Sequence, residues 1–212
     1  MKKLMTRLFA ITCTLLIALT TLFPTNARED DFDLGRNLYS TNYIFLDADT
    51  GQVLDAKKQD EQISIASLTK MMTVLLAIEN SSSLNENITI TDEMLAGLYE
   101  EQASVAGYIS GDVATLLDLC YAAAVPSAAD AANALALQIG GSFEKFYQMM
   151  NDKAAELGMN HTVFKSAHGL DRDGQYSTVE DMSKLLRYAL QNPTFKEIFS
   201  TKEYTTQATT YY

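Results

Sequence analysis

Two short apolar segments near the start of the chain flank a turn sequence. Tyr43-Ile44-Phe45-Leu46 is an apolar run, the next five residues are Asp47-Ala48-Asp49-Thr50-Gly51, and Gln52-Val53-Leu54 follows. Apolar runs on either side of a stretch rich in Asp and Gly predict two strands joined by a turn. The polar stretch 57–62 after them is predicted to be a loop.

From residue 67 the apolar positions follow a helical period. They are Leu68, Met71, Met72, Leu75 and Ile78. With few polar interruptions, this spacing predicts a largely buried helix over 67–79. Beyond a loop at 80–83 the chain is predicted to be mostly helical, until the Thr- and Tyr-rich stretch 203–212 predicts the start of a strand.

The later helices are predicted from periodicity and from their end signals. They cover 113–123, 128–139, 143–157 and a segment from Ser177 to just before Asn192-Pro193. Gly140-Gly141 and Gly158 are stop signals for the second and third of these. Ser177, with Glu180 three residues later, has the pattern of a capping box.

The first 27 residues have the composition of a secretory signal peptide. Lys2, Lys3 and Arg7 precede an uncharged stretch over 8–23, and small residues precede the expected cleavage after Ala27. An uncleaved membrane anchor is the alternative, but the stretch is short and its threonines dilute the hydrophobicity. We therefore expect an exported protein whose domain, 28–212, lies in the cell envelope, in a periplasm or at the outer face of the cytoplasmic membrane.

Charge and cysteine content narrow the class of protein further. After cleavage, 13 basic residues would face 27 acidic ones, a net charge of about −14. Such a surface repels phosphate backbones, so nucleic acid is not an expected partner. Cys120 would be the one remaining cysteine, so the domain has no internal disulfide and depends on a packed core. About 185 residues are enough for that core in one domain.

Ser67-Leu68-Thr69-Lys70, at the start of the first predicted helix, carries the strongest chemical signal. Residues three apart on a helix share a face, so Lys70 is placed beside Ser67 one turn on. The amine can then take the proton of the hydroxyl, which a serine needs before it attacks. Ser67 is predicted to be the nucleophile and Lys70 its general base.

Further segments match one family in the same order along the chain. They cover 50–54, 66–73, 125–136, 157–164 and 168–170 with 176–178, and they include Ser127-Ala128-Ala129 and His168-Gly169-Leu170. Ser-Xaa-Xaa-Lys alone is common by chance, but five ordered segments are specific. The chain resembles the serine-type D-alanyl-D-alanine carboxypeptidases, the low-molecular-mass penicillin-binding proteins of peptidase family S11.

The resemblance implies a fold and a reaction. The fold is of the α/β (α+β) class, the β-lactamase and penicillin-binding-protein-like transpeptidase fold. An antiparallel sheet packs on helices, and the active site lies between them and a mostly helical lobe. Ser67 would attack the terminal D-Ala-D-Ala bond of a peptidoglycan stem peptide to form an acyl-enzyme, with Lys70 as base. Ser127 would relay a proton to the leaving amine, and as the residue after Pro126 it is also expected to cap a helix.

The resemblance also implies partners. β-Lactams would be covalent inhibitors, no metal or cofactor is required, and membrane association would come from a C-terminal segment outside this chain. Ala129, His168 and Gly169 are the expected substrate-side residues. No carboxylate or thiolate set accompanies His161 and His168, so no metal site is predicted. Cys120, on an apolar stripe, is expected to be inert.

The chain departs from the family pattern in two places. The second motif is Ser-Xaa-Asn, and Ala129 stands where the asparagine belongs. Neither Asp130 nor Asn133 is placed to replace that amide, and one missing hydrogen bond costs about 1 to 3 kcal/mol. The third motif, Lys-Thr-Gly, does not occur in the 212 residues. We therefore expect a chain that is truncated before this motif and has little activity of its own.

Two other functions fit the same residues. A β-lactamase on this fold would differ in how fast it hydrolyses its penicillin acyl-enzyme. A non-catalytic wall-binding protein is suggested by Ala129 and by the missing third motif. Penicillin turnover and release of D-alanine distinguish these alternatives.

Overall fold

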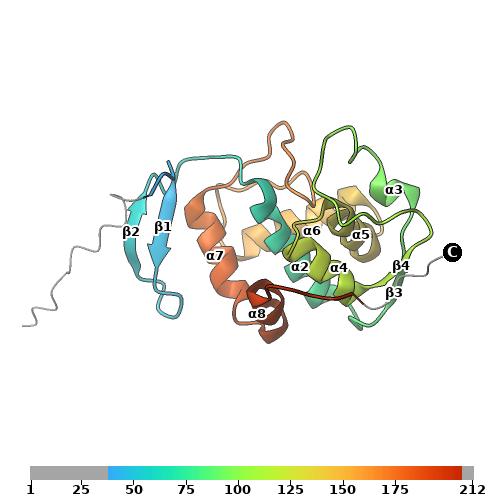
Figure 1. Cartoon of the computed structure of the whole chain (residues 1–212). Coiled ribbons are helices and arrows are strands. Elements are labelled where there is room, and N and C mark those ends of the chain that lie inside the picture. The colour runs from blue at the N-terminus through green and yellow to red at the C-terminus, as the bar shows by residue number, and fades with distance from the viewer. Residues whose placement is uncertain (1–37, 207–212) are drawn as a thin grey trace, which may run out of the picture. The chain divides into compact units, whose positions relative to one another are not determined.

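The computed structural model describes residues 38–206. The helices are α2 (Thr69–Asn80), α3 (Asp92–Leu95), α4 (Leu116–Ala124), α5 (Ala129–Gly140), α6 (Phe143–Glu156), α7 (Val179–Ala189) and α8 (Pro193–Ser200), and a 3₁₀ turn, η1 (Ala66–Leu68), precedes α2. The strands are β1 (Tyr43–Leu46), β2 (Val53–Lys57), β3 (Asn87–Thr89) and β4 (Val113–Thr115) (Figure 1). The predicted signal peptide, 1–27, lies outside the described residues.

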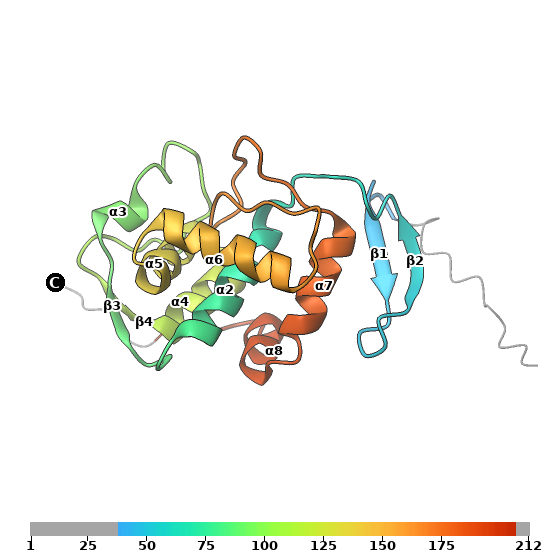
Figure 2. The same cartoon turned by 180° about the vertical axis from the view of Figure 1, so that it is seen from behind.

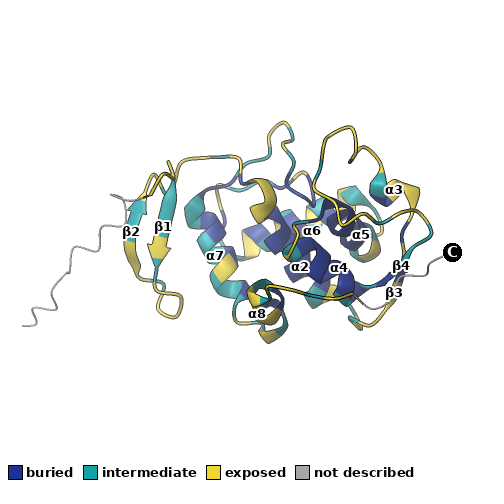
Figure 3. Ribbon diagram, viewed as in Figure 1, coloured by how far each residue is buried: buried dark blue, intermediate teal, exposed yellow. Residues whose placement is uncertain are grey.

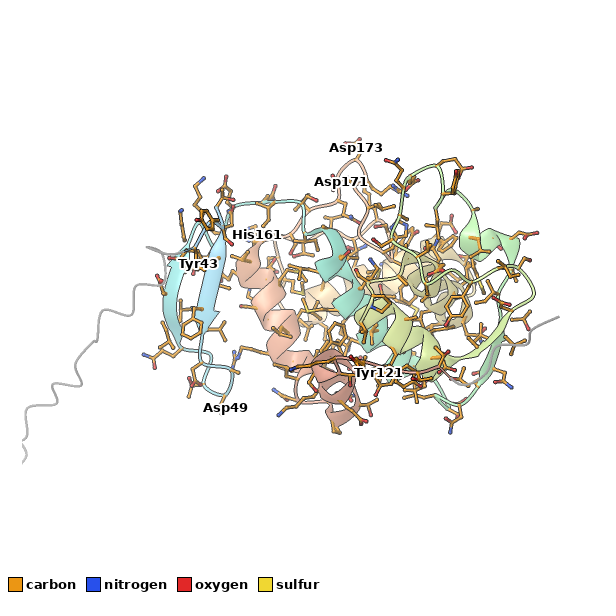
Figure 4. The ribbon with its side chains drawn as sticks, viewed as in Figure 1. Tyr43, Asp49, Tyr121, His161, Asp171 and Asp173 are labelled. Carbon is orange, nitrogen blue, oxygen red and sulfur yellow. The ribbon has the colours of Figure 1, made fainter. Side chains whose placement is uncertain are left out.

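The predicted hairpin is confirmed: β1 and β2 pair antiparallel, with Tyr43 opposite Lys57. The Asp47 carboxylate closes the turn by accepting the N–H and the hydroxyl of Thr50, both at 2.7 Å. Gly51 has φ +78, a conformation that favours glycine, and its N–H returns to the Asp47 carbonyl at 2.8 Å. Arg187 of α7 holds the turn by donating to the carbonyls of residues 48 and 49 (Figure 4 labels Tyr43 and Asp49).

Helix α2 is the centre of the core. Every residue from Thr69 to Ala77 is buried, and the helix contacts α4, α5, α6, α7 and α8. A helix that is apolar nearly all round is stable only when other elements surround it, which is the environment that the sequence predicted. Figure 2 shows α6 lying across it from behind, and Figure 3 shows the buried residues concentrated on α2, α4 and α5.

Local signals account for several helix ends. Gly141, with φ +72, follows α5 as predicted, and Gly158, with φ +69, follows α6. The capping box at Ser177 was wrong: the N-cap of α7 is Thr178, whose hydroxyl accepts from the N–H of Asp181 at 3.0 Å. Ser177 instead pairs with Ile63 in an isolated β-bridge. A serine can either cap a helix or pair in a β-bridge, and here the pairing of Ser177 with Ile63 decides between the two.

Some short elements were not predicted. Strands β3 and β4 pair antiparallel within stretches expected to be mostly helical, and α4 therefore starts at Leu116 rather than at residue 113. Thr115 is its N-cap and accepts from the N–H of Asp118 at 3.0 Å. Helix α8 was missed too, although Asn192 caps it and Pro193 stands at its first position.

The predicted strand at 203–212 is not formed by its first four residues. Residues 203–206 form no strand, and 207–212 lie outside the described residues. Tyr204 stacks on Tyr121 of α4 with ring centroids 3.7 Å apart, and its hydroxyl donates to Asp118 at 2.9 Å (Tyr121 is labelled in Figure 4). The aromatic residue that suggested a strand is used for packing on a helix.

The fold class is the one predicted, mixed helices with small antiparallel sheets. The β1–β2 hairpin contacts α7, and β3–β4 lies beside α3 and α4 (Figure 1). Cys120 is fully buried, and burial raises the pKa of its thiol to about 12. Within 38–206, no helix combines the length and hydrophobicity needed to cross a lipid bilayer.

Candidate active site

Ser67 lies in the 3₁₀ turn η1, immediately before α2. Its side chain is exposed, whereas Lys70, three residues on, is only 4% exposed. Ala66 before it has φ +44, a left-handed conformation that costs a residue with a side chain about 1 to 3 kcal/mol. This strained junction raises the serine hydroxyl to the surface directly above a buried lysine.

Lys70 is held by two oxygen atoms. Its Nζ is 3.1 Å from the Ser67 Oγ and donates to the carbonyl of His168 at 2.7 Å. No carboxylate forms a salt bridge with it in the part of the chain that the structure describes. Burial without an opposite charge disfavours the ammonium form and lowers the pKa of Lys70 to about 8. The amine therefore lies within hydrogen-bonding distance of the serine and is partly neutral near pH 7.

The loop that carries His168 and Gly169 packs on the turn that carries Ser67. Thr73 of α2 donates to the carbonyl of Ala167 at 2.6 Å, and the N–H of Gly169 donates to Ser166 at 3.1 Å. Gly169 has φ +88 and lies directly against the Ala66 carbonyl, so close that a β-carbon would overlap it. These contacts place the His168 carbonyl where Lys70 can reach it.

We predict that Gly169→Ala disrupts this contact. The methyl group would add a clash with Ala66 to the cost of the left-handed φ, for a loss of about 3 kcal/mol in unfolding free energy. Gly107→Ala is the matched control, because Gly107 has φ +93 with nothing within 4 Å of its would-be β-carbon. Urea unfolding of both variants measures the difference. Equal losses would show that the contact with Ala66 contributes nothing.

The imidazole of His168 is buried beside two cations. Burial, followed by the charges of Arg172 and Lys70, lowers the pKa of His168 to about 4. Its Nδ1 accepts the N–H of Leu170 at 3.2 Å. The ring is therefore neutral at physiological pH, and its bond to Leu170 shapes the loop; the expected substrate-side role of His168 stays a prediction.

The opposite wall comes from the segment 102–108 and is attached to α5 through Asp130. The buried Asp130 carboxylate accepts the N–H groups of residues 106, 107 and 108 at 3.0 to 3.2 Å. Ala129 donates its N–H to the Ser104 carbonyl at 2.7 Å. Arg172 ties this wall to the His168 loop, because its Nη2 donates to both carboxylate oxygens of Glu101 at 3.0 and 2.8 Å.

Between these walls lies a cavity of about 140 Å³. Its lining consists of Ala66, Ser67, Lys70, Gln102, Ala103, Ser104, Ala129, His168, Gly169 and Leu170. Five of the six predicted site residues thus meet in one place. The β1–β2 hairpin contributes no residue to this lining.

Ser127 is the predicted site residue that does not line the cavity. It is half-buried with φ +61, and the N-cap of α5 is Ala128, so the expectation that Ser127 caps this helix was wrong. Pro126 before it and the tightly packed alanines after it shift the helix start by one residue. The relay role of Ser127 stays a prediction.

The two candidates for the missing asparagine have other partners. Asp130 binds the 106–108 backbone, and Asn133 donates to the Met94 carbonyl at 3.1 Å. Neither lines the cavity. Gln102, Ala103 and Ser104 were not predicted as site residues. The one sequence signal that could have pointed to them is Asp130, an isolated acid in an alanine-rich helix start, which needs a polar partner such as a nearby loop backbone.

The two histidines of the chain, His161 and His168, do not line the same site. The backbone N–H of His161 donates to the Asp181 carboxylate at 2.8 Å, and His161 does not line the cavity. Within residues 38–206, no group of three or more His, Cys, Asp or Glu side chains is arranged to hold a metal ion.

Comparison with known proteins gives one consistent family. A family model described as D-alanyl-D-alanine carboxypeptidase matches residues 26–212. D-alanyl-D-alanine carboxypeptidase DacF of Bacillus subtilis is 34% identical over 165 residues, covering 76% of this chain and 41% of the relative. A D-alanyl-D-alanine carboxypeptidase of Streptomyces sp. strain K15 is 33% identical over 168 residues, covering 76% of this chain and 58% of the relative. The chain thus spans about half the length of the curated relatives it matches.

Solved structures give the same result for the fold. The S216A mutant of Streptomyces K15 DD-transpeptidase superimposes with a TM-score of 0.76 at 31% identity, covering 80% of this chain and 72% of that one. Penicillin binding protein 6B from Escherichia coli gives a TM-score of 0.72 at 33% identity, covering 78% of this chain and 56% of that one.

Proposed function

Because the chain belongs to the D-alanyl-D-alanine carboxypeptidase family, we propose that its protein is a serine D,D-carboxypeptidase. It removes the terminal D-alanine from peptidoglycan stem peptides and so acts in cell-wall biogenesis. The observation that carries this proposal is the 3.1 Å contact between the exposed Ser67 hydroxyl and the buried amine of Lys70, which has no carboxylate partner among the described residues. That contact is the one a serine nucleophile needs from its base.

In the first step neutral Lys70 takes the Ser67 proton as Oγ attacks the carbonyl carbon of the penultimate D-alanine. The tetrahedral intermediate then collapses: the proton that Lys70 took is passed to the nitrogen of the leaving D-alanine, the peptide C–N bond breaks, and Lys70 is neutral again. Ser67 is left as an ester of the shortened peptide. Water then attacks this ester, Lys70 again takes a proton, and the free carboxylate and the serine hydroxyl are restored.

The negative charge on the carbonyl oxygen develops next to η1 and the start of α2. The backbone N–H of Ser67 supports that charge, and the N-terminal end of a helix adds a favourable dipole. Delivery of the proton to the leaving amine is assigned to Ser127 as part of this proposal. Its position just before α5 places it in the same helical region as Ala129, which does line the cavity.

β-Lactams are proposed to be covalent inhibitors at the same serine. Attack by Ser67 on the β-lactam carbonyl opens the ring, so no fragment leaves and the acyl-enzyme blocks the site. We expect mass spectrometry of the full-length protein with penicillin to show one adduct on the peptide containing Ser67, lasting many minutes, and a D-Ala-D-Ala peptide to release D-alanine.

Each alternative gives a different result in this experiment. Penicillin turnover many times per minute would identify a β-lactamase. Neither adduct nor D-alanine, from a protein that still binds wall fragments, would identify a non-catalytic wall-binding protein. Ala129 in place of the family asparagine favours this second alternative, because the cavity then lacks one amide.

The location is also part of the proposal. The basic start and apolar stretch of residues 1–23 support export, and a wall substrate exists only outside the cytoplasmic membrane. We propose an envelope location, with any membrane association provided by a segment beyond residue 212. The strong negative charge of the chain, −11, argues against nucleic acid as a partner.

A further inference from the structure

The cavity at Ser67 offers few side chains that could hold a peptide. Apart from Ser67 and Lys70, the polar side chains in its lining are those of Gln102, Ser104 and His168. His168 is buried and its Nδ1 is already occupied by a backbone N–H. Ser104 brings a single hydroxyl. Gln102 alone brings an amide, which pairs with a peptide group because it has both a donor and an acceptor.

Gln102 also borders a second, larger space. This cavity of about 720 Å³ shares Gln102 and Ala103 with the cavity at Ser67, and most of its other walls are apolar or aromatic, including Leu98, Tyr99 and Val105. Because the two cavities share this wall, a peptide with its reacting carbonyl at Ser67 and its N-terminal part in the larger cavity would pass Gln102.

The backbone at Gln102 is strained and held in place. Its φ is +52, a conformation that costs a residue other than glycine about 1 to 3 kcal/mol and persists only where the surroundings impose it. The N–H of Gln102 donates to the Tyr99 carbonyl at 3.0 Å, and that of Ala103 to the Leu98 carbonyl at 2.9 Å. Glu101, the residue before, is fixed to Arg172. Gln102 therefore stands on a wall whose position is set before any ligand binds.

We propose that Gln102 is a substrate-positioning residue. Its side-chain oxygen accepts the N–H of the penultimate D-alanine, whose carbonyl Ser67 attacks, and so fixes the distance between the two reacting atoms. Ala129, which is bonded to the same wall through its N–H to the Ser104 carbonyl, has no polar side-chain atom and leaves this role to Gln102. The inference deepens the carboxypeptidase function proposed above and rests on it.

The test combines one substitution with one change in the substrate. The two substrates are an acylated peptide ending in D-Ala-D-Ala and its analogue with D-lactate at the penultimate position, in which an ester oxygen replaces the N–H. In the wild-type full-length protein, kcat/KM for D-alanine release should fall about tenfold on going to the analogue, the effect of one hydrogen bond. In Gln102→Ala, kcat/KM for the D-Ala-D-Ala peptide should fall about tenfold. The kcat/KM values of the two substrates should then differ by less than about twofold.

Control variants separate this role from a structural one. Gln102→Asn keeps the amide and tolerates a left-handed φ, so it should restore part of the discrimination. Gln148→Ala, on the exposed face of α6, should match the wild type. If Gln102→Ala discriminates between the two substrates as strongly as the wild type does, the role of Gln102 is overturned and the proposed function still stands. A folded wild-type protein that neither reacts with penicillin nor releases D-alanine would overturn the proposed function, and this inference with it.

Discussion

Replacing Ser67 by alanine should abolish both D-alanine release and the penicillin adduct. Loss of the nucleophile from a serine hydrolase typically lowers kcat by about 10⁴-fold or more, because no other group can form the acyl-enzyme. The Ser67 side chain is exposed, and within residues 38–206 its hydroxyl is bonded to Lys70 alone, so the variant should fold as the wild type does. Release of D-alanine and the mass of the protein after penicillin treatment measure the two effects.

Ser200→Ala is the matched control, since Ser200 is an exposed serine at the end of α8 whose hydroxyl donates to the Glu197 carbonyl. It should keep full activity. A Ser67→Ala protein that still forms the adduct would assign the nucleophile to another residue. Equal background release by the wild type and by Ser67→Ala would favour a binding protein over an enzyme.

The rate of acylation should rise with pH and level off above about pH 8. The pKa of Lys70 is lowered to about 8, so about a tenth of the amine is neutral at pH 7, against roughly one part in 3,000 for a solvated lysine. The rate of acylation by penicillin should therefore increase about tenfold per pH unit from pH 5 to 7. Stopped-flow measurement between pH 5 and 9.5 gives this profile. A flat profile would remove Lys70 from the role of base.

Lys70→Met should separate chemistry from stability. Acylation should fall by about 10³-fold, within the range for loss of a general base. The pKa of Lys70 is lower in the folded protein than in the unfolded chain, so its burial costs stability, fully below pH 8 and less as the pH rises toward 10.5. The variant should gain about 1 to 3 kcal/mol in unfolding free energy at pH 7. Lys70→Arg keeps the charge, so it should be equally slow without the gain.

The parts that local sequence signals determine were predicted correctly. The Asp47 turn fixes the β1–β2 hairpin within a few residues, and the apolar period of α2 fixes both the helix and its central place in the core. The pairing of Ser67 with Lys70 follows from their three-residue spacing, which η1 and the first turn of α2 preserve. Such features depend on neighbours along the chain, so the sequence is sufficient to find them.

The walls of the site depend on distant contacts and could not be predicted. Gln102 becomes a site residue because Asp130 gathers the backbone at 106–108, and because Glu101 meets Arg172, 71 positions away. The segment 102–108 has no apolar period, so nothing in it distinguishes a wall from a loop in solvent. The environment of Lys70 also depends on the His168 carbonyl, 98 positions away, to which Lys70 donates.

Errors of one residue arose where two local signals compete. Ser127 and Ala128 are both possible starts for α5, as Ser177 and Thr178 are for α7, and the sequence favoured the earlier serine in each case. In the structure the bridge between Ser177 and Ile63, together with the close packing at the start of α5, moves both caps one residue on. N-cap propensity ranks residue types, but it takes no account of such tertiary contacts.

The buried amine of Lys70 also predicts which residue is lost first when selection for activity ends. Natural proteins sit only slightly above the stability they need, so a feature that costs stability is lost by mutational drift unless selection for activity retains it. Ser67 is exposed and costs the fold little stability, so it can persist after the activity is lost. A buried lysine without a carboxylate cannot, because most apolar replacements would make the protein more stable. Across descendants of this gene, loss of the lysine should mark the lineages that have lost the proposed activity before any change at the serine does.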